Sequence, residues 1–207
     1  MEKDKVVKRI PLFGMGTYQL KKDAAREAVK NAIQEGYRLI DTARIYRNEV
    51  EVGEGIRESG IAREDVFITT KIPPTEQGEE KAYQAVLSSL NNLGVSWIDL
   101  VLIHWPGSAK TALDSPANTA NRQGSWNALV RLQEEGKVRL IGTSNFQIDH
   151  LETLKGPFPA VNQVELHPFL TQEPLREYCA SRGGVVQAYS SLKVGRNQQD
   201  RLEARRR

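Results

Sequence analysis

The 207-residue sequence predicts an α/β protein of the (β/α)8 or TIM-barrel type, incomplete, with about seven parallel strands. Short aliphatic runs alternate along the chain with stretches of helical periodicity, which is typical of a parallel sheet covered by helices. Polar residues follow several of the aliphatic runs, at the sheet edge where barrels carry their functional residues. An open, doubly wound sheet is the alternative, but residues 14–19 lack the third glycine of its Gly-x-Gly-x-x-Gly motif.

The strands are predicted from aliphatic runs without a polar face. Residues 100–103 read Leu-Val-Leu-Ile, which suits a strand buried on both sides, and Pro106 prevents the strand from continuing. The expected strands are residues 10–18, 37–42, 66–71, 97–103, 138–143, 160–164 and 185–188.

The helices are predicted from apolar residues three or four positions apart, as in Ala25, Val29 and Ile33, with Gly36 as the stop. The expected helices lie around residues 25–33, 48–58, 83–93, 126–130, 148–154 and 175–179. The polar segment 107–122 is expected to be a loop, of a length that is often found in lids over functional sites.

Length and composition predict one globular domain over residues 1–192, followed by a polar, basic tail over residues 193–207 that we expect to be disordered. The tail carries five arginines without interleaved aromatic residues, so we expect no nucleic-acid partner. Cys179 is the single cysteine, which fits a reducing compartment. No apolar run reaches the length of a membrane span and no signal peptide is visible, so a cytoplasmic location is the default.

Four chemically active side chains stand at or just after the predicted strand ends: Asp41, Tyr46, Lys71 and His104. Each alone has a structural explanation, such as helix capping for Asp41 or packing for Tyr46. The carboxyl ends of neighbouring barrel strands meet at one mouth. We therefore expect the four side chains to lie together.

Together they would suit proton transfer to a carbonyl oxygen. Tyrosine titrates near about 10, and a cationic Lys71 within hydrogen-bonding reach would lower that pKa, with Asp41 holding the lysine. His104 would donate a hydrogen bond to a substrate oxygen. A phenol tuned in this way can protonate the alkoxide that forms when a carbonyl accepts hydride. None of the four side chains can deliver hydride, so a nicotinamide cofactor is implied and no metal is.

Several motifs resemble one known family. They are residues 39–43 with Tyr46 after them, 48–49, 52–53, 70–71, 103–106, 142–146, 162–168 and 188–190. From about residue 10 to residue 192 the chain resembles the aldo-keto reductases, which are NADPH-dependent barrel enzymes. The resemblance implies that Tyr46 is the proton donor and that Asp41, Lys71 and His104 complete a catalytic tetrad. It also implies NADP(H) as the cofactor and a monomer.

The same resemblance assigns the binding residues. The implied cofactor contacts are Thr17, Asp41, Ser144, Asn145, Gln163, Tyr189, Ser190 and Leu192. Among them Ser144, Asn145 and Gln163 match residues that bind the nicotinamide carboxamide, and Tyr189 matches a ring that stacks on the nicotinamide. Tyr18 and Trp105 match apolar walls of a pocket that takes aldehydes or ketones.

The sequence departs from the family after Leu192, because the tail has too few apolar residues for an eighth strand. The segment that holds the 2′-phosphate of NADP in the family has no counterpart. We therefore expect strand edges that stay open, with lower stability and self-association through those edges. Two functions remain: an NAD(P)H-dependent carbonyl reductase, or a catalytically inactive, truncated remnant that binds a nucleotide or a partner.

Overall fold

A computed structural model describes residues 10–192, and within them seven parallel strands form one sheet in the order β1-β2-β3-β4-β5-β6-β7. The strands are β1 (Met15–Gly16), β2 (Leu39–Asp41), β3 (Phe67–Ile72), β4 (Ile98–Ile103), β5 (Val138–Ser144), β6 (Val161–Glu165) and β7 (Val185–Tyr189). Every strand pairs with its neighbours in sequence, as barrel strands do, whereas a doubly wound sheet reorders them. The predicted incomplete barrel is confirmed.

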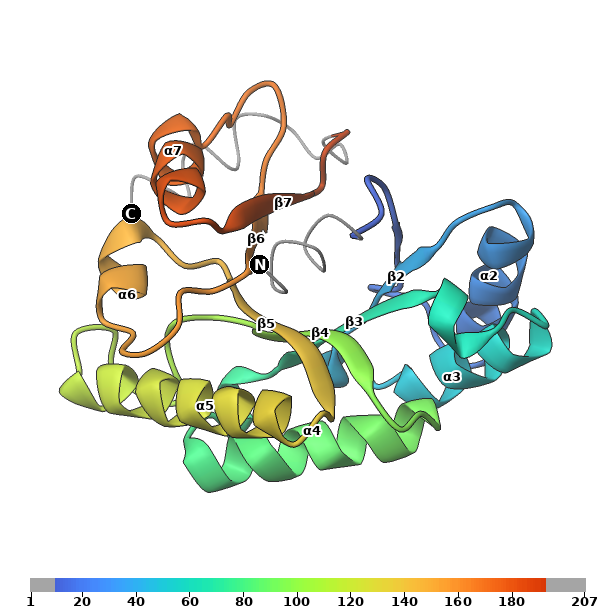
Figure 1. Ribbon diagram of the computed structural model, residues 1–207, viewed down its shortest axis with the longest axis horizontal. Coiled ribbons are helices and arrows are strands. Elements are labelled where there is room, and N and C mark those ends of the chain that lie inside the picture. Colours follow the sequence, from blue (N-terminus) through green and yellow to red (C-terminus); the bar gives the residue numbers. More distant parts are fainter. Residues whose placement is uncertain (1–9, 193–207) are drawn as a thin grey trace.

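Helices cover the outer side of the curled sheet (Figure 1). They are α2 (Asp23–Gln34), α3 (Glu49–Glu58), α4 (Glu79–Leu93), α5 (Pro116–Glu134), α6 (Ile148–Glu152) and α7 (Glu173–Ser181), with the short 3-10 helices η1 (Arg44–Tyr46), η2 (Arg63–Asp65) and η3 (Pro74–Glu76). None of the helices within residues 10–192 is long and apolar enough to cross a membrane.

The core has two layers because successive strand residues point to opposite faces of the sheet. Leu100 and Leu102 of β4 belong to a cluster inside the curled sheet, together with residues such as Leu140. Val101 and Ile103 of the same strand pack in the larger cluster between the sheet and the helices. All six residues of β4 are buried, which explains its continuous aliphatic run.

A buried ion-pair cluster lies near the amino ends of β4 and β5. Asp99, which is 3% exposed, accepts hydrogen bonds from Arg63 Nη2 at 2.6 Å and from Arg139 Nη1 at 3.0 Å. The two guanidinium groups lie 4.7 and 4.6 Å from the ring centroid of Trp97. In parallel barrels this end of the strands serves stability rather than chemistry.

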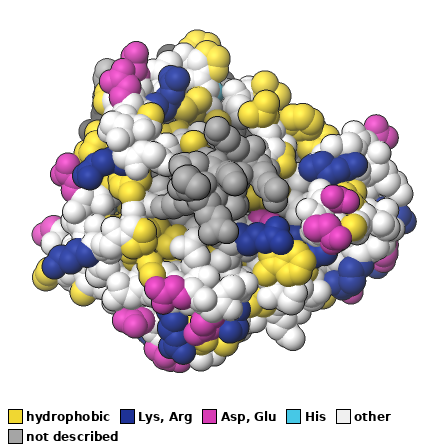
Figure 2. Space-filling model, in the orientation of Figure 1, with side chains coloured by type: hydrophobic (Ala, Val, Ile, Leu, Met, Phe, Trp, Pro, Cys, Tyr) yellow, Lys and Arg dark blue, Asp and Glu magenta, His cyan; other side chains and the backbone are white. Residues whose placement is uncertain are grey.

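The surface mixes charges of both signs. Figure 2 shows acidic and basic side chains interspersed over the visible face, with hydrophobic side chains among them. Large exposed hydrophobic residues within the described part of the chain include Leu12, Phe13, Leu113 and Phe169.

Two predicted elements differ from the structure. The first strand was expected over residues 10–18, but β1 contains only Met15 and Gly16. The loop expected over residues 107–122 is shorter, because α5 begins at Pro116 with Ser115 Oγ accepting a hydrogen bond from Ala117 N at 3.3 Å. Serine at the cap and proline at the first helical position favour this start. The predicted tail, residues 193–207, lies outside the described residues.

Among residues 10–192, the two outer strands each pair along one side only: β1 with β2, and β7 with β6. No residue of β7 is buried, and Val185 is 39% exposed, whereas every residue of β4 is buried. The predicted open edges are therefore present within this part of the chain.

Candidate active site

The carboxyl ends of the strands surround a pocket of about 740 Å³. Asp41, Tyr46 and His104 of the predicted tetrad line it. Lys71, the fourth member, is 2% exposed and does not line the pocket, but it pairs with Asp41, which does. The structure thus brings together the four side chains that the strand ends predicted.

Lys71 and Asp41 form the ion pair that the sequence predicted. Lys71 Nζ donates hydrogen bonds to Asp41 Oδ1 and to the carbonyl oxygen of Thr42, the latter at 2.9 Å. The second carboxylate oxygen of Asp41 accepts from Gln163 Nε2 at 2.6 Å. A buried ammonium is tolerated only when it is paired and hydrogen-bonded in this way, so Asp41 fixes the position of the lysine charge.

The Tyr46 ring stands over this ion pair. Lys71 Nζ lies 5.4 Å from the ring centroid, and the His104 ring lies 5.9 Å away in an edge-to-face arrangement. Burial raises the pKa of the Tyr46 phenol, and the negative charge of Asp41 raises it further. The expectation that Lys71 would lower this pKa is wrong for the chain without ligand, because the ammonium is bound to Asp41 and the phenol is largely buried.

His104 is uncharged at neutral pH. Burial, and secondarily the positive charge of Lys71, lowers the pKa of His104 to about 4. Its Nδ1 is buried and has no hydrogen-bond partner within residues 10–192. A neutral imidazole carries one N–H donor, so His104 can donate a hydrogen bond to a ligand oxygen without carrying charge.

The predicted nicotinamide contacts end the next three strands in one network. Ser144 Oγ donates to the carbonyl oxygen of Gln163 at 2.8 Å, and Asn145 Nδ2 donates to that of His104 at 3.0 Å. Tyr189 Oη donates to Asn145 Oδ1 at 2.8 Å. All of these residues except His104 were predicted as cofactor contacts, and all line the pocket, as does Ser190. Amide groups beside a flat aromatic ring fit a planar, amide-bearing ring such as nicotinamide.

Two predicted cofactor contacts lie elsewhere. Thr17 is fully buried, and its hydroxyl donates to the carbonyl oxygen of Asp41 at 3.3 Å. Leu192 is 96% exposed, and neither residue lines the pocket. The structure does not bring them to the other contacts, and their cofactor roles stay predictions.

Tyr18 and Trp105 line the pocket as predicted, and the Tyr18 ring centroid lies 5.1 Å from that of Tyr46. Ile45 and Glu165 also line it and were not predicted. The signal for Glu165 was available, because it lies two residues after Gln163 in β6 and alternate strand residues share a face.

The loop that follows β4 is fixed by a glutamine that sequence reasoning missed. Gln77, which is buried, donates from Nε2 to the carbonyl oxygens of Trp105 at 2.6 Å and Gly107 at 3.1 Å. Its Oε1 accepts from Ser108 Oγ at 2.9 Å. These bonds hold the backbone of the pocket wall at Trp105.

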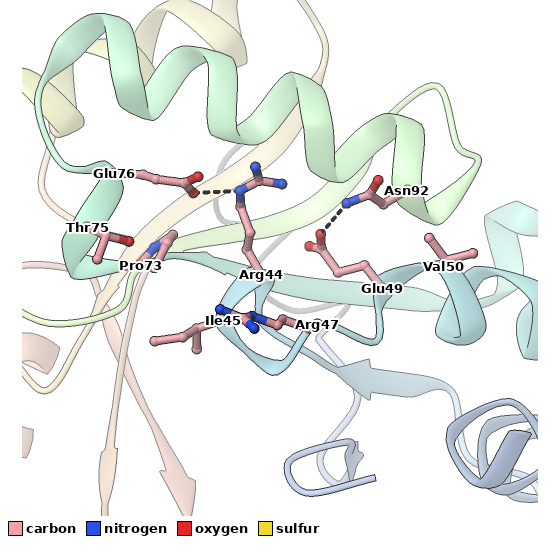
Figure 3. Close-up of a pocket in the computed structure, with 9 residues that line it drawn as sticks. All are labelled: Arg44, Ile45, Arg47, Glu49, Val50, Pro73, Thr75, Glu76 and Asn92. Atoms are coloured by element: carbon pink, nitrogen blue, oxygen red, sulfur yellow. Dashed lines mark hydrogen bonds and ion pairs between the residues drawn. The ribbon is translucent and has the colours of Figure 1, made fainter. Parts of the chain in front are cut away.

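A second pocket of about 370 Å³ lies between η1 and the start of α3 on one side and η3 and the end of α4 on the other (Figure 3). Arg44 Nε contacts Glu76 Oε2 at 2.5 Å, and Asn92 Nδ2 donates to Glu49 Oε2 at 3.1 Å. Ile45 lines this pocket and the first one, so the turn that carries Tyr46 separates the two.

Comparison with known proteins gives one family throughout. The model of the "Aldo/keto reductase family" matches residues 12–206. A "Glyoxal reductase" from Bacillus subtilis is 46% identical over 190 residues, which are 90% of this chain and 65% of the relative. The chain therefore spans about two thirds of the length of that relative.

Solved structures agree with this match. An aldo/keto reductase from Brucella melitensis has a TM-score of 0.82 and 40% identity, covering 95% of this chain and 75% of its own. A Bombyx mori aldo-keto reductase in complex with NADP has a TM-score of 0.78 and 36% identity, covering 87% of this chain and 62% of its own. The site lies at the same carboxyl ends of the strands as the motifs that suggested the resemblance. The chain belongs to the aldo/keto reductase family.

Proposed function

We propose that the chain catalyses the reduction of aldehydes or ketones to alcohols with NADPH, and that Tyr46 is the proton donor. The observation that carries the proposal is the arrangement of Tyr46, His104 and the Lys71–Asp41 ion pair around one pocket. The similar Bombyx mori structure is a complex with NADP, and the similar Bacillus subtilis protein is named a glyoxal reductase. Both names fit this reaction.

NADPH, when bound, supplies the hydride. Ser144, Asn145 and Gln163 would hold its carboxamide, and the ring of Tyr189 would lie against the nicotinamide face. Neutral His104 would donate a hydrogen bond to the carbonyl oxygen and orient it.

The raised pKa of Tyr46 keeps its phenol protonated at neutral pH, so the proton is present when the alkoxide forms. After the transfer, the phenolate needs a nearby positive charge. Lys71 supplies that charge, and Asp41 keeps the ammonium in place.

A second function follows from the open edges of β1 and β7 within the described residues. On this reading the chain is a catalytically inactive module that binds a nucleotide or pairs with a partner through those edges. If this second function is right, the chain binds the cofactor or associates with a partner but does not turn over a carbonyl substrate.

The test is a titration of the 207-residue chain with NADPH, followed by nicotinamide fluorescence, and then absorbance decay with an aromatic aldehyde. We expect fluorescence to change and absorbance to fall. Tyr46→Phe should bind NADPH as the parent does and should lose turnover, because phenylalanine has no proton to give. An unchanged rate in Tyr46→Phe would show that another group donates the proton. Binding without turnover in the parent would favour the inactive module.

A further inference from the structure

Glu49 is a buried carboxylate that the proposed mechanism does not use. It is the first residue of α3 and is 3% exposed. One carboxylate oxygen accepts from Thr70 Oγ1 at 2.7 Å, and the other accepts from Asn92 Nδ2 at 3.1 Å (Figure 3). Both hydrogen-bond partners are neutral, and the Arg44 guanidinium is a nearby positive charge. Burying a carboxylate is costly compared with burying an apolar side chain. The position of Glu49 in the fold suggests why a buried carboxylate stands here.

The partners of Glu49 connect it to the catalytic lysine. Thr70 directly precedes Lys71 in β3, and successive strand residues point to opposite faces. Lys71 therefore points inward to Asp41, while Thr70 points outward to Glu49. The Glu49 bond thus holds the side chain of Thr70, the residue of β3 next to the lysine.

Glu49 is also close in sequence to Tyr46. Tyr46 ends η1, Arg47 follows in the left-handed conformation with φ of 57°, and Asn48 precedes the helix. A non-glycine residue with positive φ is costly and persists where the surroundings require it. This short, constrained connection means that the position of Glu49 limits where the Tyr46 ring can lie.

Two further features hold the same turn. Arg44 Nε contacts Glu76 Oε2 at 2.5 Å, and Arg44, Glu76 and Glu49 line the same pocket (Figure 3). A Cβ built on Gly53 would lie 2.2 Å from the carbonyl oxygen of Leu93, so α3 approaches the end of α4 more closely than any side chain would allow. This close approach is what places Glu49 within reach of Asn92.

We propose that Glu49 is a positioning residue that fixes the proton donor Tyr46 relative to Lys71 by bonding the turn 44–48 to β3 and α4. The proposal rests on the proposed function for its effect on catalysis. Glu49 lines the second pocket and not the reaction pocket, so it acts through Tyr46.

The experiment compares Glu49→Ala with Glu49→Gln. Alanine removes both hydrogen bonds, whereas glutamine can keep the Thr70 bond and can pair with Asn92 if the asparagine amide rotates. We expect kcat to fall by about tenfold to a hundredfold in Glu49→Ala, since small misplacements of reacting groups have effects of this size. Glu49→Gln should regain most of the loss, and NADPH affinity should change less than about twofold in both.

Asp99→Asn is the matched control, because Asp99 is also 3% exposed and hydrogen-bonded but lies near the amino ends of the strands. It should lower the melting temperature and leave kcat unchanged. If Glu49 served stability alone, Glu49→Ala would behave like this control.

A second measurement is independent of turnover. Tyrosine labelled with ¹³C at Cζ gives one NMR signal per ring, and Tyr46→Phe identifies the Tyr46 signal. We expect Glu49→Ala to move that signal, Glu49→Gln to move it less, and Asp99→Asn to leave it unchanged. A Tyr46 signal that is the same in Glu49→Ala and the parent would overturn the proposal. An inactive parent whose Tyr46 signal still depends on Glu49 would overturn the proposed function and leave the positioning role standing.

Discussion

At the scale of single residues, burial determines the protonation states of His104 and Tyr46 in the site. His104 is neutral because burial and the Lys71 ammonium both oppose its protonation. The Tyr46 phenol keeps its proton for a related reason, since burial and the Asp41 carboxylate oppose the phenolate. Both groups are thus uncharged hydrogen-bond donors at neutral pH, next to the Lys71–Asp41 ion pair.

The lowered pKa of His104 predicts a pH dependence of stability. Between about pH 6.5 and pH 4 the unfolded chain binds a proton at this residue and the folded chain does not. Stability from neutral His104 is therefore full above about pH 6.5 and is lost as pH falls toward 4. We expect the parent to lose more unfolding free energy than His104→Gln between pH 7 and pH 5, as measured by urea denaturation. Equal losses in the two proteins would contradict this assignment.

Residue-scale prediction from the sequence succeeded where strand ends alone place a side chain. Asp41, Lys71 and His104 follow or end aliphatic runs, so the mouth of a barrel is where they must lie. The hydrogen-bonding roles of Gln77 and Glu49 could not be predicted, because their partners lie on other elements and no sequence spacing connects them. The predicted shift of the Tyr46 pKa had the wrong direction, because the sequence does not show how far the phenol is buried.

At the scale of elements, long apolar runs were predicted within one or two residues. The strand expected at 97–103 is β4 (Ile98–Ile103), and the one expected at 138–143 is β5 (Val138–Ser144). The start of α5 was missed because its first turns carry polar residues, such as Asn118 and Arg122, whose side chains bond the preceding loop. Tertiary hydrogen bonds replaced the apolar stripe that sequence reasoning requires.

The loop after β4 gives a prediction at this scale. Gln77→Leu removes the hydrogen bonds to the carbonyl oxygens of Trp105 and Gly107, at a cost of about 0.5–1.5 kcal/mol for each bond. We expect KM for bulky aromatic aldehydes to rise several-fold while kcat changes little, because Trp105 is a wall of the pocket and not a reacting group. Steady-state kinetics and thermal unfolding measure the two effects.

Gln133→Leu is the control for that substitution, since Gln133 is a half-buried glutamine far from the pocket that donates to the carbonyl oxygen of Arg139. It should leave KM unchanged. A fall in kcat with unchanged KM in Gln77→Leu would mean that the glutamine supports the reacting groups instead of the wall.

At the scale of the whole molecule, a barrel fold is present with strand edges unpaired among the described residues. The sequence predicted this from the absence of an eighth aliphatic run, and the strand order agrees. Exposed edges of a parallel sheet offer unpaired backbone groups to other chains. This is the physical basis for expecting association.

We predict that the 207-residue chain self-associates with rising concentration through the edge of β7. Val185 is 39% exposed, and Val185→Lys places a charge at this edge, which opposes pairing between sheets. Sedimentation velocity over a concentration series should show larger species for the parent and fewer for Val185→Lys. A parent that sediments as a monomer at every concentration would show that this edge does not pair.

The hydrogen bond from Gln163 to Asp41 joins β6 to β2, two strands that are not neighbours in the sheet. The same amide is the predicted partner of the nicotinamide carboxamide. A ligand that takes it over must exchange an internal hydrogen bond for an external one. The binding enthalpy measured by calorimetry would then be less favourable than the new hydrogen bonds to the ligand alone would make it. In a chain that already lacks the Gln163–Asp41 bond, the binding enthalpy would be more favourable.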